Sequence, residues 1–169
     1  MRDPPQGLHD FLRGYFHYKS GDHVANRTRP LTEYELGSLP TYYVMEAGKT
    51  MPETVLDEMP AEPSNWLTDD ELATYCREYR RTGFQGGLNW YRARIAGVDS
   101  AERSTIRVPT AFIAGKHDWG VYQSPGTFES MQSTICSDMR GVHFVDGAGH
   151  WVQQEQPKTT STLLLDFLA

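Results

Sequence analysis

The sequence predicts an α/β protein in which a helical region precedes a short parallel sheet. Two apolar runs near the C-terminus are each followed by a polar loop and then by a helical pattern. Strands and helices that alternate at this spacing form βαβ units with a parallel sheet and a right-handed crossover. Before the first of these runs, apolar residues recur at helical spacing instead. We therefore divide the chain into a helical region, residues 1–97, and a sheet region, residues 98–169.

The composition excludes several classes of protein. The 169 residues carry a net charge of −6, so the chain lacks the basic face of a nucleic-acid-binding protein and matches an anionic membrane surface poorly. No apolar run reaches the length of a membrane span, and the polar N-terminus is not that of a signal peptide. Cys76 and Cys136 lack metal-binding spacing. We expect two free buried thiols in a reducing compartment, the cytoplasm.

The first 66 residues predict short helices joined by loops. A first helix is expected over residues 7–18, where apolar residues fall on one face. These are Leu8, Phe11, Leu12, Tyr15 and Phe16. The polar segment that follows, up to Pro30, predicts a loop at the mouth of a pocket. Thr32 and Glu35 fit a capping box for a short helix ending near Leu39. Proline in a first turn predicts another helix over residues 52–58.

Residues 67–97 predict two neighbouring helices. Thr68 and Glu71 form a second capping box, and Gly83 ends the helix that they begin. Its apolar stripe consists of Leu72, Tyr75, Cys76 and Tyr79. A second helix follows at once over residues 85–95, and the short joint predicts that the two lie together.

The sheet region predicts two strands and two helices. Residues 106–115, IRVPTAFIAG, form a nearly unbroken apolar run, which is typical of a strand buried on both faces. A helix is expected over residues 124–136, and a second short strand over residues 141–145. Pro157 begins the last helix.

Two polar residues follow these strands and predict an acid–base pair. Asp118 lies just after the first strand, and His150 lies just after the second. Because the carboxyl ends of parallel strands meet at one edge of a sheet, we expect the two side chains to be close. A carboxylate so placed fixes the tautomer of the imidazole and stabilises its protonated form. The alternative is that Asp118 forms a turn and His150 is an ordinary loop residue. No metal-binding motif is present, although His117 and His143 lie nearby.

The segment from GKHDWG to DGAGHWVQQEQP resembles the last third of an α/β-hydrolase fold protein. The sequence around the histidine, GAGHWVQQEQP, is most similar to the epoxide hydrolase and dehalogenase branch. The resemblance covers residues 107–169, and it implies that Asp118 is the acid and His150 the histidine of a catalytic triad. It implies no cofactor.

The segment GFQGGLNWYR is similar to the helical lid of the same branch, in which a tyrosine donates a hydrogen bond to the epoxide oxygen. The resemblance places Tyr91 at that position. Counting back eleven residues from Glu53 gives Tyr42 as its partner, with the adjacent Tyr43 as the alternative. The aromatic-Gln-Glu-Pro sequence that the family has after this tyrosine is replaced here by VMEAGK. Trp90 and Trp119 are expected on the wall of the pocket or in the core. Without the resemblance, these aromatic residues are best interpreted as packing.

The chain contains no G-x-S-x-G or G-x-D-x-G sequence for a nucleophile and no HGxP or HGG loop. We therefore expect an incomplete domain: a helical lid followed by the last two strands and helices of an α/β-hydrolase fold. One hypothesis is a cytoplasmic hydrolase of a small-molecule epoxide or ester, or a dehalogenase, inactive without its nucleophile. The other is a truncated, non-catalytic, lid-bearing binding module or degenerate copy. It would associate with a partner chain or a second copy through an exposed strand edge.

Overall fold

The computed structural model describes residues 3–97 and 105–169. The boundary predicted at residue 98 lies outside these ranges. The elements of the helical region are α1 (Leu8–Tyr18), the 3₁₀ helix η1 (Glu33–Ser38), α2 (Met51–Thr54), α3 (Asp69–Thr82) and α4 (Gln85–Ile95). Those of the sheet region are β1 (Thr110–Gly115), η2 (Trp119–Val121), α5 (Thr127–Ser130), the π-helical turn η3 (Met131–Ile135), β2 (Met139–Val145), α6 (Val152–Glu155) and α7 (Pro157–Leu168).

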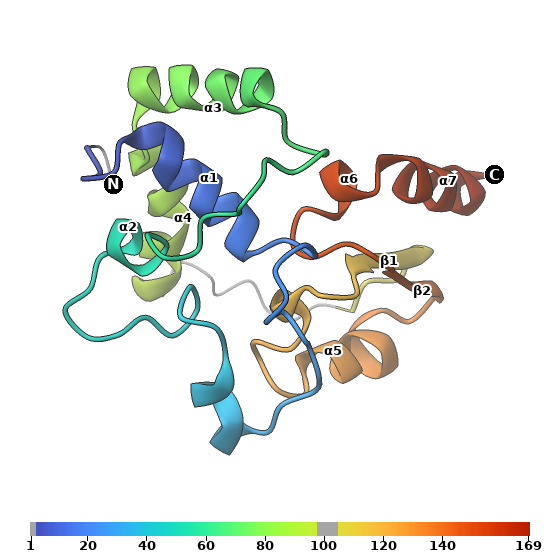
Figure 1. Cartoon of the computed structure of the whole chain (residues 1–169). Helices are drawn as coiled ribbons and strands as arrows, with labels where there is room; N and C mark the ends of the chain where they lie inside the picture. The colour runs from blue at the N-terminus through green and yellow to red at the C-terminus, as the bar shows by residue number, and fades with distance from the viewer. Residues whose placement is uncertain (1–2, 98–104) are drawn as a thin grey trace.

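The helical region is built around α1, which packs against α3 (Figure 1). The apolar face predicted for α1 is buried except for Tyr15, which is partly buried, and Leu72 and Cys76 of α3 are buried as well. Both predicted capping boxes are present, at Thr32 and at Thr68. Such caps satisfy backbone N–H groups that a helix leaves free at its first turn.

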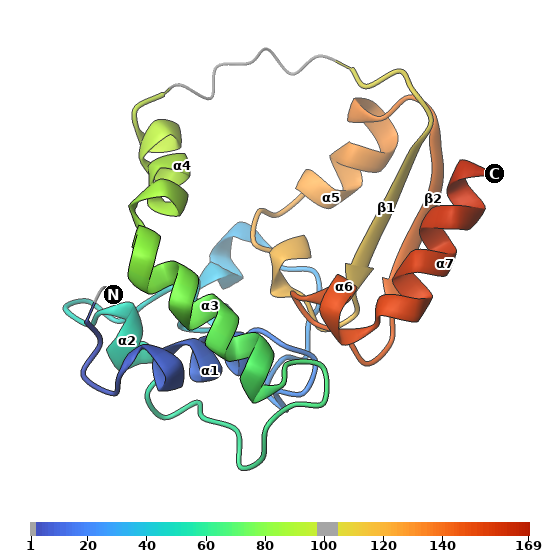
Figure 2. The ribbon, with the colours of Figure 1, turned by 90° about the horizontal axis from the view of Figure 1, so that it is seen from above.

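Two helical predictions are corrected by the structure. Helix α2 ends at Thr54 and does not reach Glu58, because the chain turns at the buried Val55, whose carbonyl lies against Gly14 of α1. Helix α4 leads away from the end of α3 and does not lie along it (Figure 2). The positive φ of Gly83 sets this exit, and Phe84 stacks on Tyr79 with ring centroids 4.3 Å apart.

The sheet consists of β1 and β2 in parallel, with register from Thr110↔Met139 to Gly115↔Val145. Figure 2 shows α5 on one side of this pair and α7 on the other. Regular pairing begins at Thr110 and not at residue 106, where Ile106 makes only an isolated bridge. The prediction of a strand buried on both faces is wrong for most of β1, in which only the last two residues are buried. In the described part of the chain β1 pairs with one strand alone, so no strand is paired to its other edge.

The remaining differences are small. The regular part of α5 begins at Thr127, after a left-handed Gly126, and the segment ends in a π-helical turn. Helix α6 was not predicted as an element separate from α7. Cys76 and Cys136 are free and buried, as expected. Among the described residues, no helix has both the length and the apolar character that crossing a bilayer requires.

The helical and sheet regions meet where three loops touch. These are the loop after α1 and the loops that follow β1 and β2. The backbone N–H of His150 donates to the carbonyl of Lys19 at 2.9 Å, and His117 Nδ1 lies 2.7 Å from the carbonyl oxygen of Asn26. This junction carries the polar residues described next.

Candidate active site

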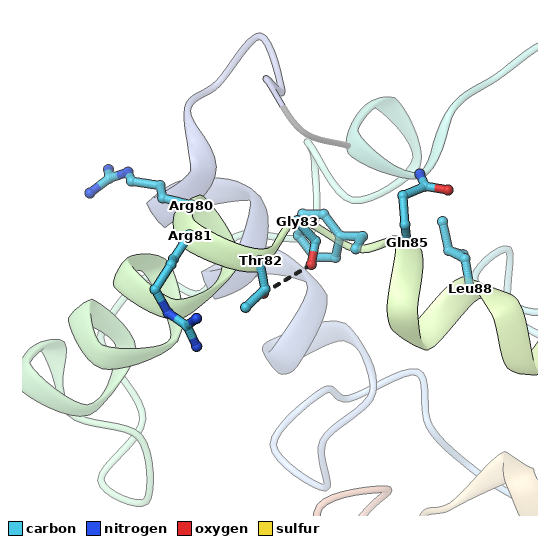
Figure 3. A pocket seen from close by; sticks show the side chains of 7 residues that line it. Arg80, Arg81, Thr82, Gly83, Gln85 and Leu88 are labelled. Carbon is cyan, nitrogen blue, oxygen red and sulfur yellow. Dashed lines mark hydrogen bonds between the residues drawn. The ribbon is translucent and has the colours of Figure 1, made fainter.

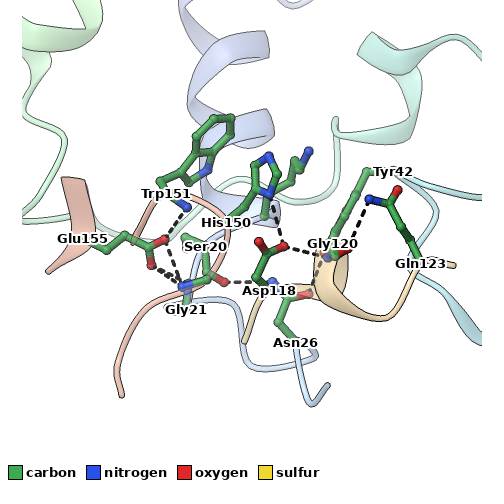
Figure 4. Close-up of polar contacts among 12 residues, drawn as sticks. Ser20, Gly21, Asn26, Tyr42, Asp118, Gly120, Gln123, His150, Trp151 and Glu155 are labelled. Atoms are coloured by element: carbon green, nitrogen blue, oxygen red, sulfur yellow. Dashed lines mark hydrogen bonds and ion pairs between the residues drawn. The ribbon is translucent and has the colours of Figure 1, made fainter. Parts of the chain in front are cut away.

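Asp118 and His150 meet at the carboxyl ends of β1 and β2 (Figure 4). His150 Nδ1 lies 3.1 Å from Asp118 Oδ1. The same carboxylate oxygen accepts the backbone N–H of Gly120 at 2.7 Å, so Asp118 also caps η2. In residues 3–97 and 105–169, the other ring nitrogen of His150 has no hydrogen-bond partner. A carboxylate on Nδ1 leaves Nε2 as the nitrogen that can exchange a proton with a ligand.

The environment of Asp118 favours its ionised form. Burial alone raises the pKa of this carboxyl. The hydrogen bond and charge of His150, the Gly120 N–H and the positive charge of Lys19 outweigh burial, and the pKa lies below its ordinary value. Asp118 can therefore stabilise a protonated His150 at neutral pH.

A buried carboxylate holds the loop that carries His150. Glu155 accepts the backbone N–H groups of Gly149 at 3.0 Å and Trp151 at 2.9 Å, on either side of the histidine. It also accepts the N–H of Gly21 at 2.6 Å, from the loop after α1 (Figure 4). Burial raises the pKa of Glu155 against the effect of these three donors. Glu155 thus joins the histidine loop to the helical region.

Glycine is required where these loops cross. A Cβ on Gly149 would lie 2.5 Å from the backbone carbon of Ser20, and one on Gly115 would overlap the carbonyl of Gly149. Real Cβ atoms do not approach backbone atoms so closely. Within the histidine loop, Gly147 has a positive φ, and Gly149 allows the close approach.

A ring of aromatic side chains stands beside the acid–base pair, around a lysine. Lys19 Nζ lies between 5.3 and 5.6 Å from four ring centroids. The rings belong to Tyr15, Tyr42, Tyr43 and Trp151.

The structure distinguishes the two candidate tyrosines, Tyr42 and Tyr43. Tyr42 is buried, and its hydroxyl donates to Asn26 Oδ1 at 3.3 Å. The Tyr43 hydroxyl lies close to Gly120 and is without a hydrogen bond among the described residues. Burial, and then the charge of Asp118, raise the pKa of Tyr43 well above its ordinary value.

Helix α4 places Tyr91 near Tyr15 and Tyr43. Tyr91 is 62% exposed, yet it is close enough to add to the rise in the pKa of both Tyr15 and Tyr43. Trp90 is 69% exposed, whereas Trp119, directly after Asp118, is buried in the core of the helical region. The indole N–H of Trp119 is buried without a partner in the described residues.

A separate hollow of about 310 Å³ lies at the joint between α3 and α4 (Figure 3). It is lined by Arg80, Arg81, Thr82, Gly83, Phe84, Gln85 and Leu88. Arg81 is held by Glu78 at 2.7 Å, and the figure shows both arginines pointing away from Gln85. The hollow contains no acid–base pair, so we place the candidate site at Asp118 and His150. Within residues 3–97 and 105–169, no cluster of three or more His, Cys, Asp or Glu side chains could hold a metal ion.

Sequence reasoning did not find Lys19, Asn26 or Glu155. Asn26 is 1% exposed, and its amide donates to the carbonyls of Tyr18 and Ser20, which shapes the loop after α1. A polar loop gives no signal of which side chains turn inward. For Glu155 a signal existed, since it belongs to the QEQP segment that follows the histidine.

Comparison with known proteins assigns the fold and the family. No protein-family model matches the chain. Over 129 residues, 69% of its length, the chain is 40% identical to epoxide hydrolase A of Mycobacterium tuberculosis (strain ATCC 25618 / H37Rv) and covers 37% of that protein. The crystal structure of epoxide hydrolase A from Mycobacterium thermoresistibile matches 99% of the chain, with a TM-score of 0.59 and 31% identity. The chain belongs to the epoxide hydrolase-like branch of the α/β-hydrolase fold family.

The α/β-hydrolase fold also accounts for the arrangement of the elements. An epoxide hydrolase from an endophytic Streptomyces superposes on 96% of the chain with a TM-score of 0.72, at 24% identity. The chain covers 46% of that structure and 50% of the M. thermoresistibile one, and it spans about a third of the length of its curated relative. In the α/β-hydrolase fold, polar loops at the carboxyl ends of parallel strands carry the chemistry. In this chain the loops after β1 and β2 hold Asp118 and His150.

Proposed function

We propose that this chain supplies the histidine, the acid and the lid tyrosines of an epoxide hydrolase. The observation that carries the proposal is the 3.1 Å contact between His150 Nδ1 and Asp118 Oδ1, two residues that are 32 positions apart in the sequence. The relatives are named as epoxide hydrolases, and we take the substrate class, an epoxide, from these names.

The proposed reaction has two steps. A nucleophilic carboxylate, for which these 169 residues hold no elbow sequence, attacks an epoxide carbon. The bond from that carbon to the ring oxygen breaks, which gives an ester and an alkoxide. Tyr91 and a second tyrosine donate hydrogen bonds to the oxygen that gains charge. The alkoxide takes a proton from one of these tyrosines. His150, held by Asp118, then takes a proton from water, and the hydroxide attacks the ester carbonyl to release the diol and the carboxylate. The proton on His150 returns to the tyrosine. With a serine nucleophile, the same frame would cleave esters.

We propose Tyr43 rather than Tyr42 as the second donor. The Tyr42 hydroxyl already donates a hydrogen bond to Asn26. The Tyr43 hydroxyl is without a hydrogen bond in the described residues, and it is close enough to Asp118 and Tyr91 for their charges to raise its pKa. Trp90 and Trp119 remain candidates for contact with substrate, Trp119 through its unpartnered indole N–H.

A chimera tests the proposal. It joins this chain to the part of M. tuberculosis epoxide hydrolase A that the chain does not match, and formation of diol from styrene oxide is measured. We expect turnover that His150→Gln lowers by at least about 10³-fold. Tyr43→Phe and Tyr91→Phe should each lower it by roughly 10²-fold. Tyr34→Phe is the matched control, since Tyr34 is 99% exposed. A folded but inactive chimera, or unchanged turnover in His150→Gln, contradicts the proposal.

A second candidate is a binding module that associates with a partner chain. One support is that the second edge of β1 has no paired strand in the described residues. The other is that three leucines of α7 are 47% to 75% exposed, namely Leu164, Leu165 and Leu168. A second copy of the chain is the simplest partner. Size-exclusion chromatography with light scattering tests this candidate, and a monodisperse monomer argues against it.

We also propose that the protein acts in a reducing compartment, the cytoplasm. The support is that Cys76 and Cys136 are both buried and unpaired, as thiols are where disulfides do not persist. Imaging of the tagged chain in its source cell, with fractionation as a control, tests the assignment.

A further inference from the structure

Lys19 is a buried ammonium that the proposed reaction does not use. The residue is 8% exposed, although it lies in a polar loop directly after α1. Its backbone carbonyl accepts the N–H of His150 at 2.9 Å, so the lysine is attached to the candidate site. Lysine is almost never buried unless it is paired, because moving its charge out of water is unfavourable.

The structure pairs this ammonium incompletely. Lys19 Nζ has one long hydrogen bond, 3.5 Å to the Tyr15 hydroxyl. Within the described ranges no carboxylate lies within 4 Å of it. The faces of four aromatic rings offset part of the lost hydration by cation–π attraction. An ammonium has three donors, so the protein leaves at least one without an acceptor.

The charged and titratable groups around Lys19 do not supply the missing acceptors for its ammonium. They are Tyr15 of α1, Tyr42 and Tyr43 of the segment after η1, and Asp118 of the loop after β1. Asp118 acts on Lys19 by charge, but its hydrogen bonds go to His150 and Gly120. Burial lowers the pKa of Lys19 to about 8 against this attraction.

We infer that Lys19 Nζ and the surrounding rings form a binding site for a small organic carboxylate, next to the Asp118–His150 pair. A single buried positive charge matches a monovalent oxyanion better than a phosphate dianion, which the nearby Asp118 would repel. The four aromatic walls suit an apolar or aromatic body attached to the carboxylate. This inference rests on the proposed function, because it uses the same site. The bound carboxylate would then be part of the substrate or of the product.

Binding of benzoate to the purified chain tests the inference, with benzamide as the neutral ligand of the same shape. Acetylation of each lysine by a trace of acetic anhydride is followed by peptide mass spectrometry. We expect saturating benzoate to slow the labelling of Lys19 at least about fivefold, because a bound anion keeps the amine protonated and covered. Benzamide should not do so. The exposed Lys49 and Lys158 serve as internal controls.

Variants separate anion binding from packing. Lys19→Met should weaken benzoate affinity by at least about tenfold, and Lys19→Arg should retain it within a few fold. If Lys19 is only a cation–π contact, wild type shows no protection by benzoate, and that result overturns the inference. Equal affinity in wild type and Lys19→Met overturns it as well. Protection by benzoate and benzamide alike also overturns it. Should Lys19→Met not fold, the labelling of wild type decides alone.

This outcome is independent of the chimera assay. Epoxide turnover without benzoate binding contradicts only the carboxylate site. Benzoate binding without turnover in a folded chimera contradicts only the proposed hydrolysis.

Discussion

Glu155 offers the sharpest test of how the candidate site is held together. Its two carboxylate oxygens divide three backbone donors. Oε1 accepts from Gly149 at 3.0 Å and Trp151 at 2.9 Å, and Oε2 accepts from Gly21 at 2.6 Å and shares the Gly149 N–H at 3.0 Å. In Glu155→Gln, one of these oxygens becomes an amide NH₂. Whichever orientation the amide takes, it faces either the Gly21 or the Trp151 N–H, and that donor loses its acceptor.

The magnitude follows from this count. One buried N–H without an acceptor lowers the free energy of unfolding by about 1–3 kcal/mol. The hydrogen bonds that remain are weaker, because their acceptor is no longer an ionised carboxylate. The neutral amide regains something, because burial disfavours the ionised Glu155, as its raised pKa shows. We expect a net loss of about 1–3 kcal/mol in the free energy of unfolding at pH 7.

Urea unfolding followed by tryptophan fluorescence measures this loss, since Trp151 lies at the site. Glu62→Gln is the matched control, because Glu62 is exposed and should change stability by less than about 0.5 kcal/mol. The pH dependence gives a second readout. With its folded pKa raised above 4.5, Glu155 takes up a proton on folding as the pH falls toward that value. Wild type should therefore gain stability relative to Glu155→Gln in that window. A variant as stable as wild type refutes the assignment of Glu155 as the acceptor of three N–H groups.

Three further predictions concern stability and reactivity. Gly149→Ala should destabilise the chain by more than about 2 kcal/mol in urea, because its Cβ meets the backbone of Ser20 at 2.5 Å, and a smaller loss means that the loops can separate. Asp118 has a lowered pKa, so its contribution is present above its unfolded pKa of 3.8 and disappears as the pH falls through its folded pKa. The difference between wild type and Asp118→Asn in urea should therefore shrink below about pH 4, and a constant difference argues against the ion pair. Cys76 and Cys136 are buried, and burial raises the pKa of Cys76, so a thiol reagent should react at least about 100-fold more slowly in buffer than in urea; equal rates indicate open thiols.

The sequence predicts well what depends on local chemistry. Thr68 with Glu71 and Thr32 with Glu35 are capping boxes whose partners lie three residues away, and both form as expected. The proximity of Asp118 and His150 also follows from a simple rule, that neighbouring parallel strands end at one edge. The resemblance to the α/β-hydrolase fold, stated on the GKHDWG and DGAGHW segments, agrees with the comparisons.

What the sequence does not show depends on partners distant along the chain. Lys19 lies in a segment that differs in no way from an exposed loop, and its burial depends on Tyr42 and Trp151, which follow far downstream. Periodicity predicts the helix over residues 85–95 correctly but not its direction, which follows from the φ of Gly83 and the stacking of Phe84. Apolar composition overstates the burial of β1, because burial also depends on neighbouring strands, and the described residues supply one.

The loop after α1 is hydrogen-bonded to the sheet region, although it lies about 90 residues before β1. Its backbone holds His150 through the Lys19 carbonyl, and its Gly21 N–H holds Glu155, which in turn fixes the histidine loop. A change in this loop therefore moves the imidazole relative to Asp118 without touching either residue. Since Lys19 itself belongs to this loop, the position of the acid–base pair and that of the proposed carboxylate site are set together. A ligand that orders the carboxylate site should therefore also order the acid–base pair. Labelling of Lys19 thus reports on the acid–base pair as well, although Lys19 lies in a polar loop.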